Sequence, residues 1–177
     1  MKRPIARGLL VSSLVIALIS VFAAGHFIGL RLNMTPSYPL GLWRAIPPGR
    51  EVLVGDTVLI CPPPSPTFAV ALERGYLVRG VCPGWMSPLI KTVAAVAGQR
   101  VEIGSAVLVD GKPVPISDIH HTDASGRLLN AWPGGRVPPD QVFLLSSYAG
   151  SYDSRYFGPV PIEGLLGLAI PVITFEP

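Results

Sequence analysis

Charged side chains are missing from one long stretch of this 177-residue sequence: no Asp, Glu, Lys or Arg occurs from Gly8 to Leu30. A helix of this length, at ~1.5 Å per residue, is sufficient to cross a hydrocarbon core of ~30 Å. The stretch is also longer than the ~7–15-residue apolar segment of a cleaved signal peptide. We therefore predict one uncleaved transmembrane helix over residues 8–30. Lys2 and Arg3 before it, with Ala23-Ala24-Gly25 inside it, keep a cleaved signal peptide as the alternative.

An excess of charge of either sign is missing from the rest of the chain. Residues 31–177 hold 11 Lys and Arg against 11 Asp and Glu, because Lys2, Arg3 and Arg7 account for the whole formal charge of +3. A domain with balanced charge lacks the basic surface by which proteins bind nucleic acid, so we expect no nucleic-acid partner. The three basic residues place segment 1–7 in the cytoplasm by the positive-inside rule. The sequence thus predicts a single-pass membrane protein whose residues 31–177 form a domain outside the cytoplasm, in a periplasm-like space.

Cysteine is scarce, since the chain contains only Cys61 and Cys82. Two cysteines are too few ligands for a structural zinc site. Both lie in the predicted periplasmic domain, where disulfides form and persist. A Cys61–Cys82 bridge would close a loop of about 20 residues and stabilise the fold by ~3 kcal/mol. Two buried free thiols are the alternative.

Histidine is almost as rare, and two of the three histidines are adjacent, as His120-His121. Together with Asp118 and Asp123 they suggest a Ser-His-Asp triad or a metal site. However, the surrounding segment is polar and contains glycine, as solvated loops do, and the spacing matches no known ligand pattern. We therefore predict neither a metal nor any other cofactor.

Hydrophobic patterning beyond Arg31 favours a mostly β domain with little helix. Short apolar runs bounded by Gly, Pro and Asp predict strands over 52–60, 89–97, 100–103, 106–114, 141–147 and 165–175. Asp110-Gly111 within the fourth run is typical of a hairpin turn. Between the cysteines we predict a short helix over 68–74, with Ser65 or Thr67 as its N-cap and Gly75 at its end. Residues 116–139 are polar and contain Gly and Pro, so we expect a loop or small subdomain.

One serine lies between two prolines just beyond the predicted anchor, in Thr35-Pro36-Ser37-Tyr38-Pro39. Proline fixes its own φ and pushes the preceding residue towards extended conformations, so both prolines stiffen the backbone around Ser37. A rigid, exposed serine suits a nucleophile, and the Thr35 hydroxyl and the Ser37 N–H could converge on an oxyanion. An ordinary proline-flanked turn is the alternative.

A single lysine, Lys91, interrupts the most apolar run of the domain, Leu89 to Ala97. On a strand, both the face that carries Lys91 and the opposite face are essentially apolar, and no acidic residue lies nearby in sequence. An ammonium group buried without a partner tends to lose its proton, which makes Lys91 a candidate base for a Ser/Lys dyad with Ser37. Alternatively, Lys91 lies at a strand edge or pairs with a distant carboxylate.

A third polar group of residues lies near the C-terminus, in Ser151-Tyr152-Asp153-Ser154-Arg155. Asp153 and Arg155 can form a charge-assisted pair in one short loop, and Ser151 and Ser154 can bond backbone or side chains there. A purely structural turn would use the same residues.

Together these segments resemble the Ser/Lys type I signal peptidase superfamily, and more specifically its TraF-type conjugative-transfer branch. The form Ser-x-Pro-x-Gly-x-aromatic, from Ser37 to Trp43, is similar to that branch. Residues 54–58, 89–93 and 151–158 resemble, in order, the strand after the nucleophile, the lysine strand and the late Asp-Ser-Arg motif. Gly98-Gln99 departs from the usual Gly-Asp after the lysine strand. The segment 99–141 is too short for the large second domain of some general signal peptidases, which fits the TraF form.

The resemblance implies a signal-peptidase-like β-sheet catalytic domain in which Ser37 is the nucleophile and Lys91 the general base. Thr35 and the Ser37 N–H would form the oxyanion hole. The residues implied to support the site are Asp153, Ser154 and Arg155. The implied function is that of a membrane-anchored serine endopeptidase that processes, and in some relatives cyclises, a membrane-inserted pilin precursor. A general type I signal peptidase and a non-catalytic anchored β domain in pilus assembly are the alternatives.

Overall fold

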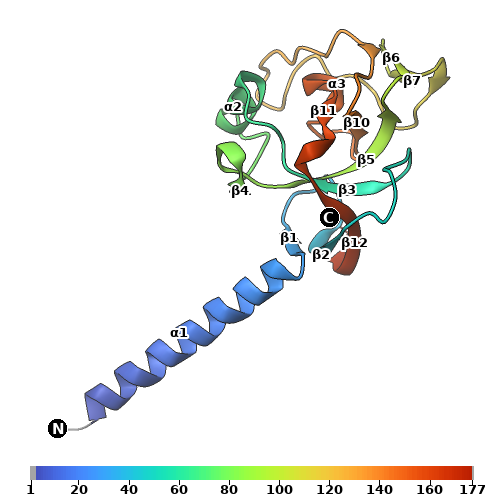
Figure 1. The fold of residues 1–177 in the computed structure, drawn as a ribbon. Coiled ribbons are helices and arrows are strands. Elements are labelled where there is room, and N and C mark those ends of the chain that lie inside the picture. Colours follow the sequence, from blue (N-terminus) through green and yellow to red (C-terminus); the bar gives the residue numbers. More distant parts are fainter. Residues whose placement is uncertain (1–2, 177) are drawn as a thin grey trace.

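The computed structural model describes residues 3–176, with side-chain environments from Val11 onward. A long N-terminal helix, α1 (Arg3–Phe27), stands apart from a β domain that contains the rest of the described chain (Figure 1). This arrangement confirms the predicted mostly β domain preceded by one helix. Met1 and Lys2, which belong to the predicted cytoplasmic tail over 1–7, lie outside the described residues.

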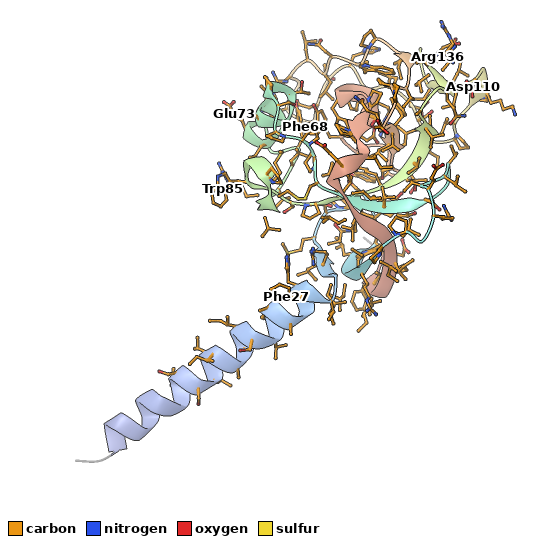
Figure 2. All side chains as sticks on the ribbon, viewed as in Figure 1. Phe27, Phe68, Glu73, Trp85, Asp110 and Arg136 are labelled. Atoms are coloured by element: carbon orange, nitrogen blue, oxygen red, sulfur yellow. A yellow bond between two sulfur atoms is a disulfide. The ribbon has the colours of Figure 1, made fainter. Side chains whose placement is uncertain are left out.

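Helix α1 ends at Phe27, earlier than the predicted limit of the anchor. Gly29 adopts a φ of 86°, which glycine reaches without steric cost, and the chain turns there into strand β1 (Leu30–Asn33). From Val11 to Phe27 the large apolar side chains of the helix are exposed, including Phe27 at the end of the helix next to the β domain (Figure 2). Among the described residues, however, no helix combines the length and the apolarity of a membrane span. The structure therefore does not support the predicted transmembrane helix over 8–30.

The β domain contains two antiparallel sheets. Within the described residues the larger sheet has seven strands in the order β1-β2-β12-β3-β5-β10-β11, and the smaller has four in the order β8-β7-β6-β9. The other strands of the larger sheet are β2 (Leu40–Ile46), β3 (Thr57–Ile60), β5 (Leu89–Val96), β10 (Gln141–Leu145), β11 (Val160–Pro161) and β12 (Leu165–Phe175). The smaller sheet contains β6 (Arg100–Ile103), β7 (Val107–Val109), β8 (Lys112–Pro113) and β9 (Gly135–Arg136). Because β2 pairs with both β1 and β12, the two ends of the β domain meet at one edge of the larger sheet (Figure 1).

Most predicted strands are confirmed, and the departures have local causes. Strand β3 is shorter than the predicted 52–60, because Gly55 has a φ of 94° and the Asp56 N–H donates to the Leu53 carbonyl (3.1 Å), which makes this segment a turn. Strand β12 accommodates Pro171 in its interior because its register against β2 shifts there. The predicted hairpin turn joins β7 to β8, with positive φ at both Asp110 (49°) and Gly111 (75°).

The predicted helix between the cysteines is α2 (Pro66–Glu73). Ser65 is its N-cap, with Oγ accepting a hydrogen bond from the Phe68 N–H at 3.4 Å, and Pro66 occupies the first turn, where no N–H is needed. Gly75 follows the helix with a φ of 77°, as expected for a residue that ends a helix.

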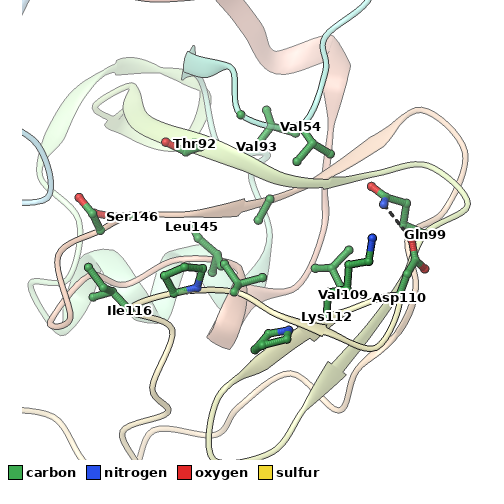
Figure 3. Close-up of a pocket in the computed structure, with 16 residues that line it drawn as sticks. Val54, Thr92, Val93, Gln99, Val109, Asp110, Lys112, Ile116, Leu145 and Ser146 are labelled. Atoms are coloured by element: carbon green, nitrogen blue, oxygen red, sulfur yellow. Dashed lines mark hydrogen bonds between the residues drawn. The ribbon is translucent and has the colours of Figure 1, made fainter.

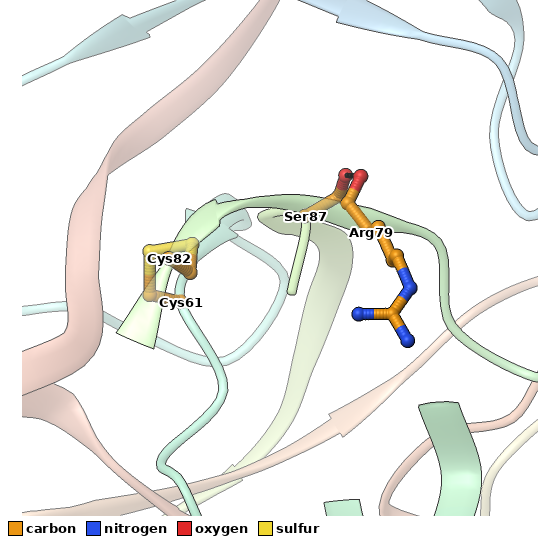
Figure 4. Close-up of a disulfide and its surroundings, with 4 residues drawn as sticks. All are labelled: Cys61, Arg79, Cys82 and Ser87. Atoms are coloured by element: carbon orange, nitrogen blue, oxygen red, sulfur yellow. Dashed lines mark hydrogen bonds between the residues drawn. A yellow bond between two sulfur atoms is a disulfide. The ribbon is translucent and has the colours of Figure 1, made fainter. Parts of the chain in front are cut away.

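The predicted Cys61–Cys82 disulfide is present and ties the end of β3 to β4 (Arg79–Cys82) (Figure 4). A short 3-10 helix, η1 (Pro83–Trp85), follows β4, and a second, η2 (Ile162–Gly164), precedes β12. Beside the disulfide, the Ser87 hydroxyl donates to the Arg79 carbonyl at 2.9 Å and closes the turn after β4. The disulfide therefore anchors the excursion that contains α2 to the larger sheet.

Buried apolar clusters fix strand β5 from both of its faces. One cluster packs α2 against the larger sheet and includes Val58, Ile60, Phe68, Val93 and Leu144. On the opposite face of β5, Ile90 packs with Trp43, Leu59 and Ala169. Further along, β5 and β10 pack on the smaller sheet through Ala95, Val101, Val107 and Phe143. Since apolar burial contributes about 25 cal/mol per Å², a strand packed on both faces is a rigid platform for the lysine it carries.

Candidate active site

Ser37 lies in the turn that joins β1 to β2, and the side chain of Asn33 holds this turn together. Asn33 Nδ2 donates to the carbonyls of Thr35 (3.0 Å), Tyr38 (2.9 Å) and Pro39 (3.1 Å). Asn33 Oδ1 accepts hydrogen bonds from the Thr35 N–H (3.1 Å) and the Thr35 hydroxyl (2.8 Å). Such side-chain bonds to nearby backbone are what makes Asn a turn residue. The Thr35 hydroxyl must release Asn33 before it can donate to an oxyanion.

Two further residues of the Ser37-to-Trp43 motif are explained by packing. Gly41 has a φ of 126°, and a Cβ at this position would collide with the carbonyl oxygen of Ile173 on β12. The buried Trp43 indole donates from Nε1 to the Pro39 carbonyl at 3.0 Å. The spacing of the motif is therefore that of a turn fitted closely against a neighbouring strand.

The same turn is tied to strands that are remote in sequence. Ser146, buried just after β10, donates from its hydroxyl to the Ser37 carbonyl at 2.6 Å. The Tyr38 hydroxyl is hydrogen-bonded to Thr92 Oγ1 on β5, and burial raises the pKa of Tyr38, so the phenol is neutral near pH 7. Ser37 is consequently held on a backbone with little freedom.

Lys91 lies in β5 and is almost completely buried, with only 3% of its surface exposed. Its Nζ donates to the Ser151 hydroxyl oxygen at 2.6 Å. Burial lowers the pKa of Lys91 from 10.5 to about 8, an effect that the negative charge of Asp153 opposes and the positive charge of Arg155 reinforces. Near pH 8, about half of such lysines are neutral and able to accept a proton.

Asp153 and Arg155 form a fully buried ion pair at the start of α3 (Ser154–Phe157). Arg155 Nε and Nη2 donate to Asp153 Oδ1 and Oδ2 at 2.8 and 2.9 Å, a two-pronged geometry that strengthens and orients the pair. Arg155 Nη1 donates to the Asp118 carbonyl at 2.7 Å. The Ser154 hydroxyl accepts a hydrogen bond from the Leu144 N–H at 2.9 Å, which fixes α3 against β10.

The remaining hydrogen bonds of this ion pair reach the two serines that contact Ser37 and Lys91. Arg155 Nη2 donates to the Ser151 carbonyl at 3.1 Å, and Ser151 is the residue that receives Lys91. Asp153 Oδ2 accepts a hydrogen bond from the Ser146 N–H at 3.2 Å, and Ser146 is the residue that holds the Ser37 carbonyl. The Asp153–Arg155 pair is therefore a shared support behind both candidate catalytic residues.

Ser37 and Lys91 line one small pocket of about 50 Å³, which also includes Thr35, Ile90 and Tyr152. Thr35 and Ser37 also line a larger groove of about 680 Å³. One wall of this groove comes from the end of α2, and the other from the predicted loop over 116–139. Ser37 therefore lies at both the small pocket and the larger groove.

A cluster of polar contacts joins the two walls of the larger groove. Asp123 accepts hydrogen bonds from the Tyr76 hydroxyl and from Arg127 Nε, both at 2.6 Å, and these bonds lower the pKa of Asp123. Arg74 Nη1 donates to the Leu128 carbonyl at 3.1 Å, and Arg127 Nη2 donates to the Arg74 carbonyl at the same distance. Segment 116–139 is therefore held beside Ser37 as a wall of the groove.

His120 lines the same groove, and its backbone N–H donates to the Tyr156 hydroxyl at 3.1 Å. The alternative of a metal site needs several ligands in one place. Across the described part of the chain, no group of three or more His, Cys, Asp and Glu side chains is placed to hold a metal ion. Asp123, the partner considered for the histidines, is bound instead by Tyr76 and Arg127.

A second groove, of about 520 Å³, begins beside Thr92 and Ser146 (Figure 3). Its lining is largely aliphatic and includes Val109, Ile116 and Leu145, while Gln99 donates to Asp110 at 2.9 Å on its far side (Figure 3). Thr92 and Ser146 also bond the turn that carries Ser37. The chain therefore offers one groove lined largely by polar side chains and one largely aliphatic groove close to the candidate nucleophile, in addition to the small pocket.

Two residues of this site were missed by the sequence analysis, Asn33 and Ser146. Asn33 had a local signal, since an Asn shortly before a proline-containing turn commonly bonds that turn. Ser146 had none, because its partner Ser37 lies 109 residues away. Ser151 was expected to bond within its own loop, whereas its hydroxyl receives Lys91 from β5.

Comparison with known proteins agrees with the motifs. The family model described as "Signal peptidase, peptidase S26" matches residues 3–174. The chain is 52% identical over 176 residues to "Conjugal transfer protein TraF" of Agrobacterium fabrum, covering 99% of both chains. It is 36% identical over 157 residues to "Plasmid transfer protein TraF" of Escherichia coli, covering 86% of this chain and 87% of that protein. Among solved structures, a signal peptidase I of Enterococcus faecalis aligns with a TM-score of 0.42 and 17% identity, covering 67% of this chain and 97% of that chain.

Proposed function

This chain belongs to the signal peptidase family, peptidase S26, and from that premise we propose that it is a membrane-associated serine endopeptidase of conjugative transfer. In this proposal Ser37 is the nucleophile and Lys91 the general base. The resemblance to the TraF-type branch, predicted from four short motifs, is confirmed by relatives of that name over nearly the whole chain.

The observation that carries the proposal is the environment of Lys91. Its ammonium group is buried, its pKa is lowered to about 8, and it lines the same small pocket as Ser37. A base with a pKa near the working pH is efficient in proton transfer, and burial is how a lysine reaches that range. Support from Ser151 and the Asp153–Arg155 pair keeps the amine in place while it changes charge.

The proposed reaction has two steps. Neutral Lys91 takes the proton of the Ser37 hydroxyl as Ser37 Oγ attacks the scissile carbonyl carbon. The negative charge that develops on the carbonyl oxygen of the substrate is stabilised by the Ser37 N–H and the Thr35 hydroxyl. Protonated Lys91 then gives its proton to the leaving amine, which leaves an acyl-enzyme. Lys91 next deprotonates a water, or the amino terminus of the cleaved chain, as that group attacks the ester. Protonated Lys91 then returns the proton to Ser37 Oγ as it leaves. Hydrolysis and cyclisation therefore differ only in the acceptor.

The substrate class rests on the small pocket and on the relatives. The pocket beside Ser37 and Lys91 is small, about 50 Å³, which favours a small substrate side chain there. The relatives are named for conjugal and plasmid transfer. We therefore propose cleavage after a small residue of a pilin precursor. The charge-free stretch from Gly8 to Leu30 and the exposed apolar side chains of α1 support a location at the inner membrane, with the catalytic domain in the periplasm.

The test is mass spectrometry of a pilin precursor co-expressed with the wild-type chain, Ser37→Ala or Lys91→Ala. A shortened precursor with the wild type alone is the expected result, and a further loss of one water indicates cyclisation. Ser105→Ala is the matched control, because its side chain is exposed and lines none of the pockets described beside Ser37. Retention of the disulfide and of the helical and β circular dichroism signals establishes that each variant is folded.

Each alternative function gives a different result. Processing that persists in both Ser37→Ala and Lys91→Ala overturns the dyad and favours a non-catalytic scaffold in pilus assembly. Rescue of general secretion in a cell depleted of its signal peptidase favours a housekeeping enzyme. Labelling of Ser37 by an acylating β-lactam-like probe, lost in Lys91→Ala, tests the nucleophile without any knowledge of the substrate.

A further inference from the structure

A pocket of about 420 Å³ lies where α1 joins the β domain, and two arginines line it. Its walls come from the end of α1, the following turn, β2 and Leu166, and the residues that matter here are His26, Phe27, Ile28, Arg31, Arg44 and Ile46. The lining is therefore part cationic and part apolar. None of it belongs to the small pocket or groove beside Ser37.

Arg31 lines this pocket, and one nitrogen of its guanidinium group has no hydrogen-bond partner. Its Nη1 donates to the carbonyls of His26 (2.9 Å) and Leu30 (2.8 Å), which uses both hydrogens of that nitrogen and caps the end of α1. Its Nε, in contrast, is the one buried side-chain nitrogen or oxygen of the described residues that has no hydrogen-bond partner. A buried donor without a partner is unfavourable, so native proteins rarely leave one without a ligand, ion or water.

Arg155 shows how the Nε and Nη2 groups of a buried arginine bind an anion in this protein. Arg155 uses Nε and Nη2 together to hold the two carboxylate oxygens of Asp153. Arg31 presents the same pair of nitrogens, but the four ion pairs among the described residues include neither Arg31 nor Arg44. Burial lowers the pKa of Arg31, yet a guanidinium stays protonated near pH 7, so the pocket keeps an uncompensated positive charge.

Arg44 adds a second cation to the same pocket. Its Nε donates to the Ile28 carbonyl at 3.2 Å, which leaves the terminal nitrogens of this exposed side chain for a ligand. Two guanidinium groups around one cavity favour a phosphate group, which accepts several charge-assisted hydrogen bonds at once.

The surroundings indicate that the phosphate belongs to a lipid. Next to the pocket, Phe27 and Ile28 are 87% and 57% exposed, and Leu32 on β1 is 65% exposed. The apolar side chains of α1 continue this surface away from the domain, as the sticks along the helix show (Figure 2). A ligand with an anionic head and apolar chains matches both parts of the surface.

We propose that the pocket between α1 and β2 binds the phosphate of an anionic phospholipid, with Arg31 Nε and Nη2 and the Arg44 guanidinium as donors and the acyl chains along α1. Because Arg31 lies on β1, which leads directly into the Ser37 turn, a bound lipid fixes the height of the catalytic domain above the bilayer. The site does not depend on the proposed peptidase activity.

Native mass spectrometry of the full chain in detergent, with phosphatidylglycerol or phosphatidylcholine added, tests the site. We expect the wild type to retain one phosphatidylglycerol at least tenfold more than phosphatidylcholine, and the Arg31→Gln/Arg44→Gln double variant to lose this preference. Arg100→Gln is the matched control, since Arg100 is an exposed arginine of the smaller sheet.

Because Arg31 also caps α1, the single variant Arg44→Gln is measured in parallel, and it should lower retention severalfold without disturbing the helix end. Equal retention of both lipids, or retention of phosphatidylglycerol by the double variant, overturns the proposal. Inorganic phosphate that displaces phosphatidylglycerol at equal concentration also overturns it, because the site would then recognise a free anion rather than a lipid.

Discussion

Two Asp–Arg clusters lie beside the candidate site, one in the interior and one with its arginine at the surface. Asp153 and Arg155 are fully buried, and outside the pair their side chains bond the Ser146 N–H, the Ser151 carbonyl and the Asp118 carbonyl. Ser146 and Ser151 are the residues that contact Ser37 and Lys91. Asp123 and Arg127 hold segment 116–139 against Tyr76, and the Arg127 side chain is 42% exposed. The two ion pairs join the same residue types but differ in geometry and in solvation. Arg155 binds both carboxylate oxygens of Asp153, whereas the Arg127 side chain binds one oxygen of Asp123, and in the second pair it is the arginine that is exposed, since the Asp123 side chain is only 7% exposed.

That difference decides what each cluster contributes. In the interior, a charge that has lost its partner is neither hydrated nor paired. Removing one member of a buried pair therefore lowers the stability of the fold strongly. At the surface, water replaces a lost partner, and exposed pairs contribute little to stability. The candidate catalytic residues are therefore positioned by the cluster that tolerates change least, while the groove wall is held by the one that tolerates it best.

The largest expected effect comes from breaking the buried pair with Arg155→Met. The uncompensated Asp153 carboxylate should lower the free energy of unfolding by about 3–5 kcal/mol. Urea denaturation of the full chain in detergent, followed by tryptophan fluorescence, measures the change. Adding Asp153→Asn removes the isolated charge and should recover part of the loss. A midpoint for Arg155→Met equal to that of the wild type would show that the pair does not support the fold.

The second prediction concerns Lys91, a buried cation that carries no ion pair of its own. Its pKa is 10.5 in the unfolded chain and about 8 in the folded chain, so the unfolded state binds more protons between these values. The free energy of unfolding therefore rises as the pH rises from 8 to 10.5, and the destabilisation is complete below pH 8. At about 1.4 kcal/mol per pKa unit, it amounts to about 3 kcal/mol.

Lys91→Met should accordingly be more stable than the wild type at pH 7 and should lose the rise in stability above pH 8. Urea denaturation at pH 7 and pH 9.5 checks both points, with Lys112→Met as the control at an exposed lysine. In the wild type, kcat/KM should rise with pH through about 8, because only neutral Lys91 accepts the Ser37 proton. A wild-type activity that does not change between pH 6.5 and 9 would rule out Lys91 as the base.

The sequence predicted the parts of the fold and the site whose causes are local. The disulfide, α2 with its Ser65 cap, and the Asp110-Gly111 hairpin follow from residues close together in the chain. The apolar run around Lys91 predicted its burial because a strand inside a core exposes neither face.

The rest depends on pairings that no local pattern encodes. Ser146 reaches Ser37, and Ser151 reaches Lys91, only because β5 and β10 lie side by side. The prediction extended the helix to Leu30 because an apolar leucine fits both a helix and a strand. In the structure Leu30 pairs with Arg44 and therefore belongs to β1. The candidate site residues could therefore be predicted from local sequence patterns, but the residues that contact them could be found only once the order of the strands was known.

The smallest expected effect comes from Arg127→Met, the same chemical change made in the exposed cluster. Arg127→Met removes the side-chain bonds to Asp123 and to the Arg74 carbonyl, but Asp123 keeps the bonds that it accepts from the Tyr76 hydroxyl and from the Ser125 and residue-127 N–H groups. The melting temperature should fall by no more than about 3 °C, and less in 0.5 M salt, because exposed pairs are screened. Amide exchange should accelerate in residues 122–128 alone, since this part of the loop loses one of its bonds to the end of α2. If Arg127→Met instead destabilises the whole domain as much as Arg155→Met, solvation is not what separates the two clusters, and the wall of the groove is as integral to the fold as the support behind Ser37.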